Sequence, residues 1–190
     1  GQPLHAFDFD LVAGGRLVVR MAGEGEKMTT LDDVERTLDA QMGLICDDDG
    51  PTSIAGIMGG QRSEVHDGTT RVLMEAAAWN GPVLQRASHR LGLRTEASSR
   101  FEKGLAPEIT MWAQAVSTKL MLELCGARLV PGTVDIGGEG PPPKTIRLRD
   151  EKVTRLLGTE IPVGEQAELL ERLEFEVHDA GDGLDVTVPA

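Results

Sequence analysis

Two side chains that can hold or transfer a proton lie in apolar stretches of this sequence. His5 is the histidine of residues 2–8 (QPLHAFD), and Glu75 is the carboxylate of residues 73–77 (LMEAA). A buried carboxylate must accept hydrogen bonds or have a raised pKa, and groups perturbed in this way often belong to functional sites. Taken alone, each pattern has an ordinary alternative: a structural histidine, and an exposed glutamate at the end of a strand.

A glycine-rich segment could bring a ligand close to the backbone. Residues 55–60 (AGIMGG) contain Gly56, Gly59 and Gly60 directly after an apolar run. Closely spaced glycines permit positive φ angles and a close approach of another group to the main chain. A tight turn without a ligand fits the same pattern.

One basic island interrupts an acidic chain. The formal net charge is −12, yet residues 86–103 carry five basic side chains against Glu96 and Glu102. This island is the best candidate for contact with phosphate, although a solvated helix face with i,i+4 ion pairs is also expected from such a pattern. Its basic residues are Arg86, Arg90, Arg94, Arg100 and Lys103.

Composition and motif searches exclude several other chemistries. The acidic balance and the low aromatic content (four Phe, two Trp, no Tyr) argue against broad nucleic-acid binding, so any RNA contact must be local. No P-loop, dinucleotide fingerprint or nucleophile elbow is present. We expect no metal site: residues 47–50 (DDDG) predict a solvated turn, and Cys46 and Cys125 predict two buried thiols in a reducing cytosol.

The elements that must position these residues mix strands with helices, which predicts an α+β fold with a mixed sheet in the first domain. We expect the clearest helix, from Pro107 to Gly126, to bury its stripe of Ile109, Trp112, Val116, Leu120 and Leu124 in the core. Strands are predicted at residues 16–21, 43–46, 53–58, 71–75 and 127–136, and two further helices at 80–91 and 95–103.

A change of composition predicts a second domain. Residues 137–144 (GGEGPPPK) read as a Gly/Pro linker. In residues 145–190 we expect a strand, two short helices and a hairpin around residues 180–183. No membrane span or signal peptide is predicted, and both ends of the sequence read as cut.

Four motifs in order carry a family resemblance. GQPLHAFD, IAGIMGG, LMEAAAW and LGLRTEASSRFEKG resemble the editing domain of phenylalanyl-tRNA synthetase beta subunits. IRLRDEKVTRLLG, LLERLEFEV and LDVTVPA resemble the start of the following domain of that subunit, which is related to winged-helix folds. The resemblance implies an editing domain at residues 1–136 that lacks its N-terminal segment, and a partial winged-helix-like domain at residues 145–190.

The resemblance also implies an activity, because members of the family hydrolyse tyrosine mischarged on phenylalanine tRNA. Glu75 would read the tyrosine hydroxyl, and His5 would position the ester or the attacking water. Gly56 and Gly59 would offer backbone groups. The pocket would be lined by Pro3, Thr95 and Ala97.

The implied setting is a cytoplasmic ligase. The parent enzyme would charge tRNA(Phe) with phenylalanine, using ATP and Mg²⁺ bound outside this chain, as a heterotetramer of two alpha and two beta subunits. This chain itself would need no cofactor and would touch no membrane. Two alternatives stay open: a non-catalytic module that binds tRNA or another subunit, and a structural scaffold.

Overall fold

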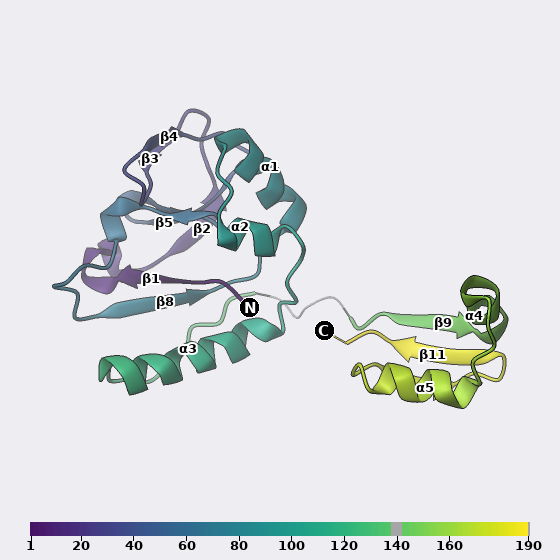
Figure 1. Cartoon of the computed structure of the whole chain (residues 1–190). Coiled ribbons are helices and arrows are strands. Elements are labelled where there is room, and N and C mark those ends of the chain that lie inside the picture. Colours follow the sequence, from purple (N-terminus) through teal and green to yellow (C-terminus); the bar gives the residue numbers. More distant parts are fainter. Residues whose placement is uncertain (138–141, 190) are drawn as a thin grey trace. The chain divides into compact units, whose positions relative to one another are not determined.

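The computed structural model describes residues 1–137 and 142–189. Contacts within it divide the chain into two compact units, Gly1–Val134 and Asp135–Ala190 (Figure 1). The predicted linker at residues 137–144 falls largely on residues 138–141, which lie outside the described residues. The α+β class is confirmed, and every strand pair in the described residues is antiparallel.

A four-stranded sheet forms the centre of the first unit. Its inner strands bury Leu44, Ile45, Cys46 and Ile54, which gives the unit much of its apolar core. The strands, in spatial order, are β2 (Val18–Met21), β5 (Gly43–Asp47), β6 (Gly50–Ile54) and β7 (Met58–Gly59). Asp48 and Asp49 form the turn between β5 and β6, as the sequence predicted, but Asp47 is buried and not solvated.

A two-stranded ribbon joins distant parts of the first unit. Strand β1 (Leu4–Asp8) pairs with β8 (Val72–Ala76) in a register that places His5 opposite Glu75. Phe7 is fully buried and Leu73, its register partner, packs against the same core cluster. Because side chains alternate along a strand, His5 and Glu75 lie on this core-facing side of the ribbon.

Two helices with clear start signals follow the ribbon. Helix α1 (Gly81–Leu91) begins after Asn80, whose side chain accepts a hydrogen bond from the Val83 amide, and it ends at Gly92 in the left-handed region (φ 63°). Helix α2 (Glu96–Phe101) begins after Thr95. The remaining elements of this unit are β3 (Lys27–Thr29), β4 (Glu35–Thr37) and the 3-10 helices Phe9–Leu11, Ala13–Gly15 and Gln61–Ser63.

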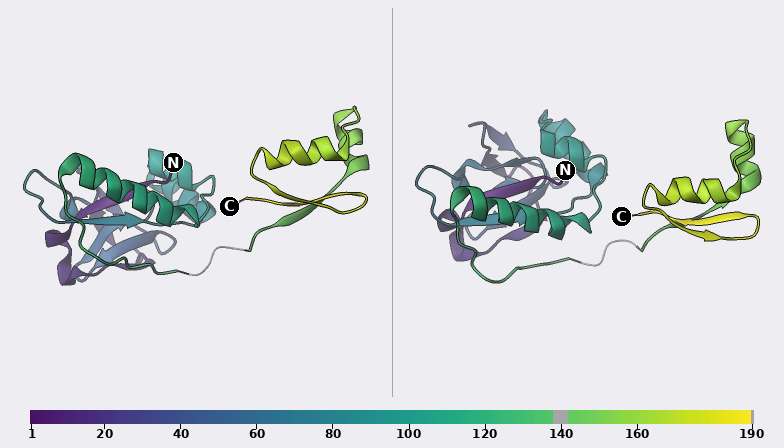
Figure 2. Two further views of the ribbon diagram at one scale, coloured as in Figure 1. Left: turned by 90° about the horizontal axis from the view of Figure 1, so that it is seen from below. Right: turned by 60° about the horizontal axis from the view of Figure 1, so that its bottom comes forward.

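The prediction that the stripe on the long helix is core was wrong. Helix α3 (Ile109–Cys125) runs beside β8 (Figures 1 and 2), where Ala113 is buried and Gln114 Nε2 donates to the Met74 carbonyl (3.5 Å). The small and polar side of α3 thus faces the ribbon. Its apolar stripe points outward, and Trp112 is 70% exposed and Leu124 78% exposed.

Two smaller predictions also fail after α3. Residues 127–136 form no strand, because Pro131 lacks an N–H to donate and Gly132 has a φ of 108°. Val134 and Ile136 are almost fully exposed. Cys46 is buried as expected, but Cys125 is exposed at the end of α3.

The second unit is a small antiparallel sheet with two helices. The sheet order is β10-β11-β9, and the predicted hairpin is present at β10 and β11. Leu184 and Val186 of the central strand are buried. The elements are β9 (Thr145–Arg149), α4 (Asp150–Leu157), α5 (Val163–Glu171), β10 (Glu176–Asp179) and β11 (Gly183–Thr187).

None of the helices described is both long enough and apolar enough to cross a membrane. Within residues 1–137 and 142–189, no cluster of three or more His, Cys, Asp or Glu side chains could hold a metal ion.

Candidate functional site

His5 lies on β1 with its ring held between the core and the glycine segment. Its imidazole makes an edge-on contact with Phe7, with ring centroids 4.5 Å apart. The Nε2 atom is buried and has no hydrogen-bond partner among the described residues. Burial lowers the pKa of His5, so its ring is neutral at pH 7. A buried ring nitrogen with no protein partner is an unsatisfied polar group, which in a native protein points to a functional role or to a bound water.

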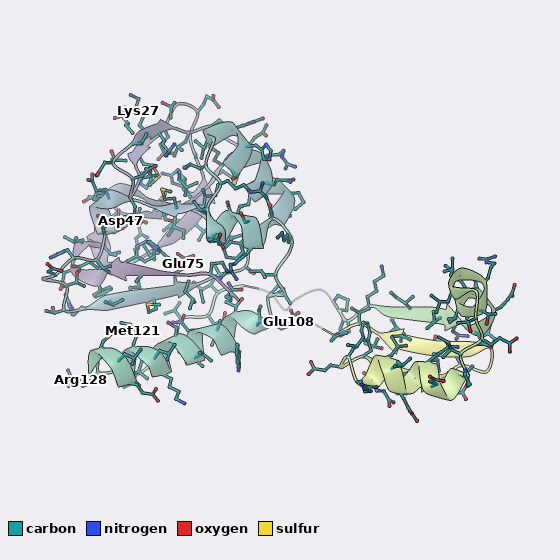
Figure 3. The ribbon with its side chains drawn as sticks, viewed as in Figure 1. Lys27, Asp47, Glu75, Glu108, Met121 and Arg128 are labelled. Atoms are coloured by element: carbon teal, nitrogen blue, oxygen red, sulfur yellow. The ribbon has the colours of Figure 1, made fainter. Side chains whose placement is uncertain are left out.

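Glu75 is the register partner of His5 on β8 (Figure 3). Burial raises the pKa of Glu75 to about 7, because removing a carboxylate from water disfavours its charged form. Near neutral pH much of this side chain is therefore an uncharged carboxylic acid. In that form it can donate one hydrogen bond and accept others.

Gly59 lies against His5 from the opposite side of the site. A β-carbon on Gly59 would come within 2.4 Å of His5 Cε1 and 3.1 Å of Leu31 Cδ1, so only glycine fits beside the imidazole. The Gly59 carbonyl accepts a hydrogen bond from the Leu31 amide (3.0 Å). The structure thus brings His5, Glu75 and Gly59 together from three strands.

Thr95 connects α2 to the glycine segment. Its hydroxyl donates to the Ile57 carbonyl (2.8 Å) and accepts from the Ser98 amide (3.0 Å). Ser98, which is fully buried, returns the contact by accepting from the Thr95 amide, which completes a capping box. The Thr95 hydroxyl is therefore occupied within the protein, and its position fixes the turn that leads to Gly59.

The other predicted pocket residues have packing roles in this structure. Gly56 adopts a φ of 68°, and a β-carbon there would meet Leu84 at 2.4 Å and Trp79 at 2.7 Å. A glycine at this position lets the turn pack under α1. The predicted contact of its backbone with a ligand stays a prediction. Ala97 packs against the main core cluster, and Pro3 is half-buried just before β1.

The predicted RNA-contact residues are all exposed, and most form ion pairs. Arg90 pairs with Asp39 (2.8 Å), Arg94 with Glu102 (3.0 Å), and Arg100 more distantly with Glu96 (3.5 Å). Arg86 forms no ion pair with any described residue. The sequence therefore identified exposed cations correctly but could not show which of them were paired.

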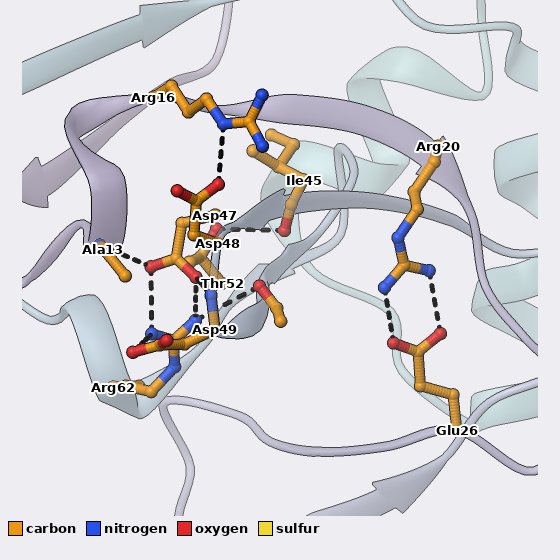
Figure 4. A network of polar contacts seen from close by, with 11 residues as sticks. Ala13, Arg16, Arg20, Glu26, Ile45, Asp47, Asp48, Asp49, Thr52 and Arg62 are labelled. Carbon is orange, nitrogen blue, oxygen red and sulfur yellow. Dashed lines mark hydrogen bonds and ion pairs between the residues drawn. The ribbon is translucent and has the colours of Figure 1, made fainter.

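An ion pair between a buried aspartate and a partly exposed arginine, near the glycine segment, was missed from the sequence. The Asp47 carboxylate accepts two hydrogen bonds from Arg62 (2.6 and 2.9 Å) and one each from the Ala13 and Asp49 amides (Figure 4). This network fixes the 3-10 helix that follows Gly59 and Gly60. The sequence contains both partners, Arg62 shortly after the glycines and Asp47 in the acidic segment. Nothing in the sequence indicates that their side chains pair.

An apolar cavity of the first unit does not contain the predicted site. It has a volume of about 430 Å³, lies between β2, β6 and α1, and is almost entirely apolar. Val19, Ile54, Trp79, Val83 and Leu84 are among its lining residues. It adjoins the turn at Gly56 through Ala55 and Ile57, but neither His5 nor Glu75 lines it.

Comparison with known proteins identifies both units. Residues 1–126 match the B3/4 domain family, and residues 146–190 match the tRNA synthetase B5 domain. The whole chain is 50% identical to the phenylalanine–tRNA ligase beta subunit of Moorella thermoacetica and 43% identical to that of Geobacter metallireducens, covering 24% of each. It thus spans about a quarter of the length of these relatives. A crystal structure of an N-terminal fragment of the Pyrococcus horikoshii phenylalanyl-tRNA synthetase beta subunit aligns with 98% of this chain and 53% of that one, at 20% identity and a TM-score of 0.45. The chain therefore belongs to the family of phenylalanine–tRNA ligase beta subunits and contains B3/4 and B5 domains.

Proposed function

We propose that this chain hydrolyses tyrosine from mischarged tRNA(Phe), as the editing region of a phenylalanine–tRNA ligase. The observation that supports the proposal is the meeting of His5, Glu75 and Gly59 on the core-facing side of the β1–β8 ribbon. A half-buried neutral imidazole and a half-buried carboxylic acid, with a buried glycine packed against the imidazole, are suited to polar recognition and hydrolysis of an ester.

Glu75 is proposed to select tyrosine over phenylalanine. The two amino acids differ by one hydroxyl, and an apolar pocket rejects an added hydroxyl only weakly. A site that hydrogen-bonds the hydroxyl discriminates far better, because phenylalanine would leave its polar group unpaired at a cost of about 1–3 kcal/mol. With a pKa near 7, Glu75 can offer the phenol either a donor or an acceptor.

His5 is proposed to orient the attacking water. Its unpartnered Nε2 can accept a proton of that water, and contact with Gly59 and Phe7 fixes the plane of the ring. The water oxygen forms a bond to the ester carbon, the bond from that carbon to the tRNA oxygen breaks, and a proton passes to the tRNA oxygen. The products are tyrosine and uncharged tRNA.

The setting of this activity is also part of the proposal. We assign the charging reaction, with its ATP and Mg²⁺, to parts of the ligase outside this chain. We place the chain in a cytoplasmic assembly with alpha subunits, two of each kind, with tRNA(Phe) as the shared substrate. The relatives' printed name, phenylalanine–tRNA ligase beta subunit, supports this assignment.

The test is deacylation of tyrosyl-tRNA(Phe), measured for the chain alone and within a complete phenylalanine–tRNA ligase. Glu75→Ala and His5→Ala should each slow release of tyrosine by at least about 100-fold, because Glu75 would hold the tyrosine hydroxyl in the site and His5 would act on the attacking water. Charging with phenylalanine should be unchanged. Glu123→Ala on the exposed side of α3 is the matched control and should release tyrosine at the normal rate. Normal deacylation by the Glu75 and His5 variants would remove the site assignment.

A further inference from the structure

Three arginines form an exposed strip from α1 to the turn before α2, here named the α1 patch: Arg86, Arg90 and Arg94. We propose that the α1 patch binds the phosphate backbone of the tRNA whose charged end enters the site of His5 and Glu75. This proposal rests on the proposed function, because it assumes that the substrate is an RNA.

The helix geometry directs the patch outward. Arg86 and Arg90 are four residues apart and lie on one side of α1, while Leu84 and Ala87 are buried on the opposite side. After α1 ends at Gly92, Arg94 lies in the connecting turn, four residues after Arg90 in the sequence. The side chain of Arg94 is 73% exposed, so its guanidinium is accessible to a large ligand.

The patch is tied to the candidate site through one residue. Thr95 follows Arg94 directly, and its hydroxyl holds the Ile57 carbonyl two residues before Gly59. The α1 patch is therefore linked, through Thr95 and Ile57, to the segment that contacts His5. An RNA held on α1 would have its phosphates beside the element that positions the site.

The negative net charge of the chain means that RNA binding needs a local group of cations. With a net charge of −12, the chain repels a polyanion, so binding requires cations concentrated beside the site. Arg62, by contrast, is committed to the buried Asp47. Arginine also suits phosphate, because its guanidinium donates two parallel hydrogen bonds.

The Arg90 ion pair within the patch can be exchanged for phosphate. Arg90 and Asp39 are both solvent-accessible. An exposed pair of this kind contributes little to stability, so exchanging its carboxylate for a phosphate costs the fold little. Glu102 is only 12% exposed, so Arg94 keeps this partner and offers phosphate its remaining N–H groups. Arg86 forms no ion pair with a described residue and can bind phosphate without releasing any partner.

The experiment measures binding of uncharged tRNA(Phe) to the 190-residue chain by fluorescence anisotropy, from about 50 to about 200 mM salt. Each phosphate contact contributes roughly 0.7–0.9 to the slope of log affinity against log salt. Arg86→Gln alone should lower that slope by just under one. The triple variant Arg86→Gln, Arg90→Gln, Arg94→Gln should lower it by about two to three and weaken affinity at least about tenfold.

The matched control removes the same total charge elsewhere. Arg16, Lys27 and Lys119 are exposed cations in surface ion pairs, and their triple change to Gln should leave the slope unchanged. An equal decrease of the salt slope in the two triple variants would overturn the proposal. Absence of binding by the unaltered chain at low salt would also overturn it.

Different measurements test the α1 patch and the hydrolytic site. Glu75→Ala should bind tRNA normally without releasing tyrosine. The Arg86→Gln variant should release tyrosine with a raised KM and an unchanged kcat. If Glu75→Ala still hydrolyses while the patch variants lose their salt slope, the hydrolytic site is wrong and the patch stands.

Discussion

The imidazole of His5 and the α-carbon of Gly59 are in such close contact that a methyl group on Gly59 would come within 2.4 Å of His5 Cε1. The two residues come from strands in different sheets, so their contact joins the ribbon to the central sheet. This contact makes Gly59 a direct test of the site, because its substitution moves His5 without altering any titratable group.

Gly59→Ala should displace His5 and slow tyrosine release by at least about tenfold, at a stability cost of about 1–3 kcal/mol from overpacking. Tyrosyl-tRNA deacylation and urea denaturation measure the two effects. Gly23→Ala is the control, because a β-carbon there makes only an ordinary contact at 3.6 Å. Deacylation at the normal rate by Gly59→Ala would show that the position of the His5 ring is irrelevant.

The raised pKa of Glu75 predicts an unusual pH dependence of stability. Above pH 4.5 the unfolded chain loses this proton, whereas the folded chain keeps it up to about pH 7, so the folded state binds more protons and loses stability as pH rises through this window. The loss is on the order of 3 kcal/mol. Glu75→Gln should abolish this loss of stability, so that the variant is more stable than the native chain at pH 8. Urea denaturation at pH 5 and pH 8 measures the difference, and equal stability of both proteins at pH 8 would contradict the assigned pKa.

Asp47 should be a strong determinant of stability. Burial alone would raise its pKa, but hydrogen bonds from Arg62 and from two backbone amides outweigh burial and lower it. Asp47→Asn should lower the free energy of unfolding by about 2–3 kcal/mol at pH 7. The charged hydrogen bonds are lost, and Arg62 is left without the carboxylate with which it pairs. Since the native pKa is lowered, this difference should shrink as pH falls below about 4.

Asp48→Asn provides the comparison within the same turn. Asp48 pairs with Arg16, and both side chains are exposed, so its loss should cost only about 0.5 kcal/mol. Chemical denaturation of the two variants side by side separates the buried pair from the surface pair. A similar cost for both would mean that the Asp47 network contributes no more than an ordinary surface contact.

Thr95 should affect both stability and the site. Thr95→Ala removes the cap of α2 and the hydrogen bond to Ile57, which should cost about 1–2 kcal/mol and reduce tyrosine release. Thr95→Ser keeps the hydroxyl and should retain nearly all stability and activity. If Ser and Ala at this position behave alike, the hydroxyl does not position the glycine segment.

Local signals predicted much of the fold. Asn80, Gly92 and the Thr95 cap determine helix ends through contacts within a few residues, so the helices of residues 80–103 could be predicted from sequence. The stripe on α3 was misjudged for a physical reason. Apolar spacing shows that Trp112 and Leu124 share one side of a helix, but it cannot show which side meets the ribbon, and here Thr110, Ala113 and Gln114 lie toward β8.

The sequence suggested which residues belong to the candidate site, and their role stays a prediction, but the sequence could not give their geometry. The motifs identified His5, Glu75 and Gly59, yet the register that sets His5 opposite Glu75 depends on pairing between distant strands. The same is true of Asp47 and Arg62, whose contact no local pattern predicts. Thr95 and Gly56 were assigned to substrate, whereas their contacts to Ile57, Leu84 and Trp79 show how they support the turn.

The pairing of β1 with β8 has a consequence for how the chain is made. His5 and Glu75 are 70 positions apart in the sequence, so their meeting requires closure of a long loop, and contacts of this range form slowly in folding. During synthesis His5 leaves the ribosome long before its partner strand exists. A growing chain therefore holds His5 without its partner, and the candidate site is complete only when the unit has closed.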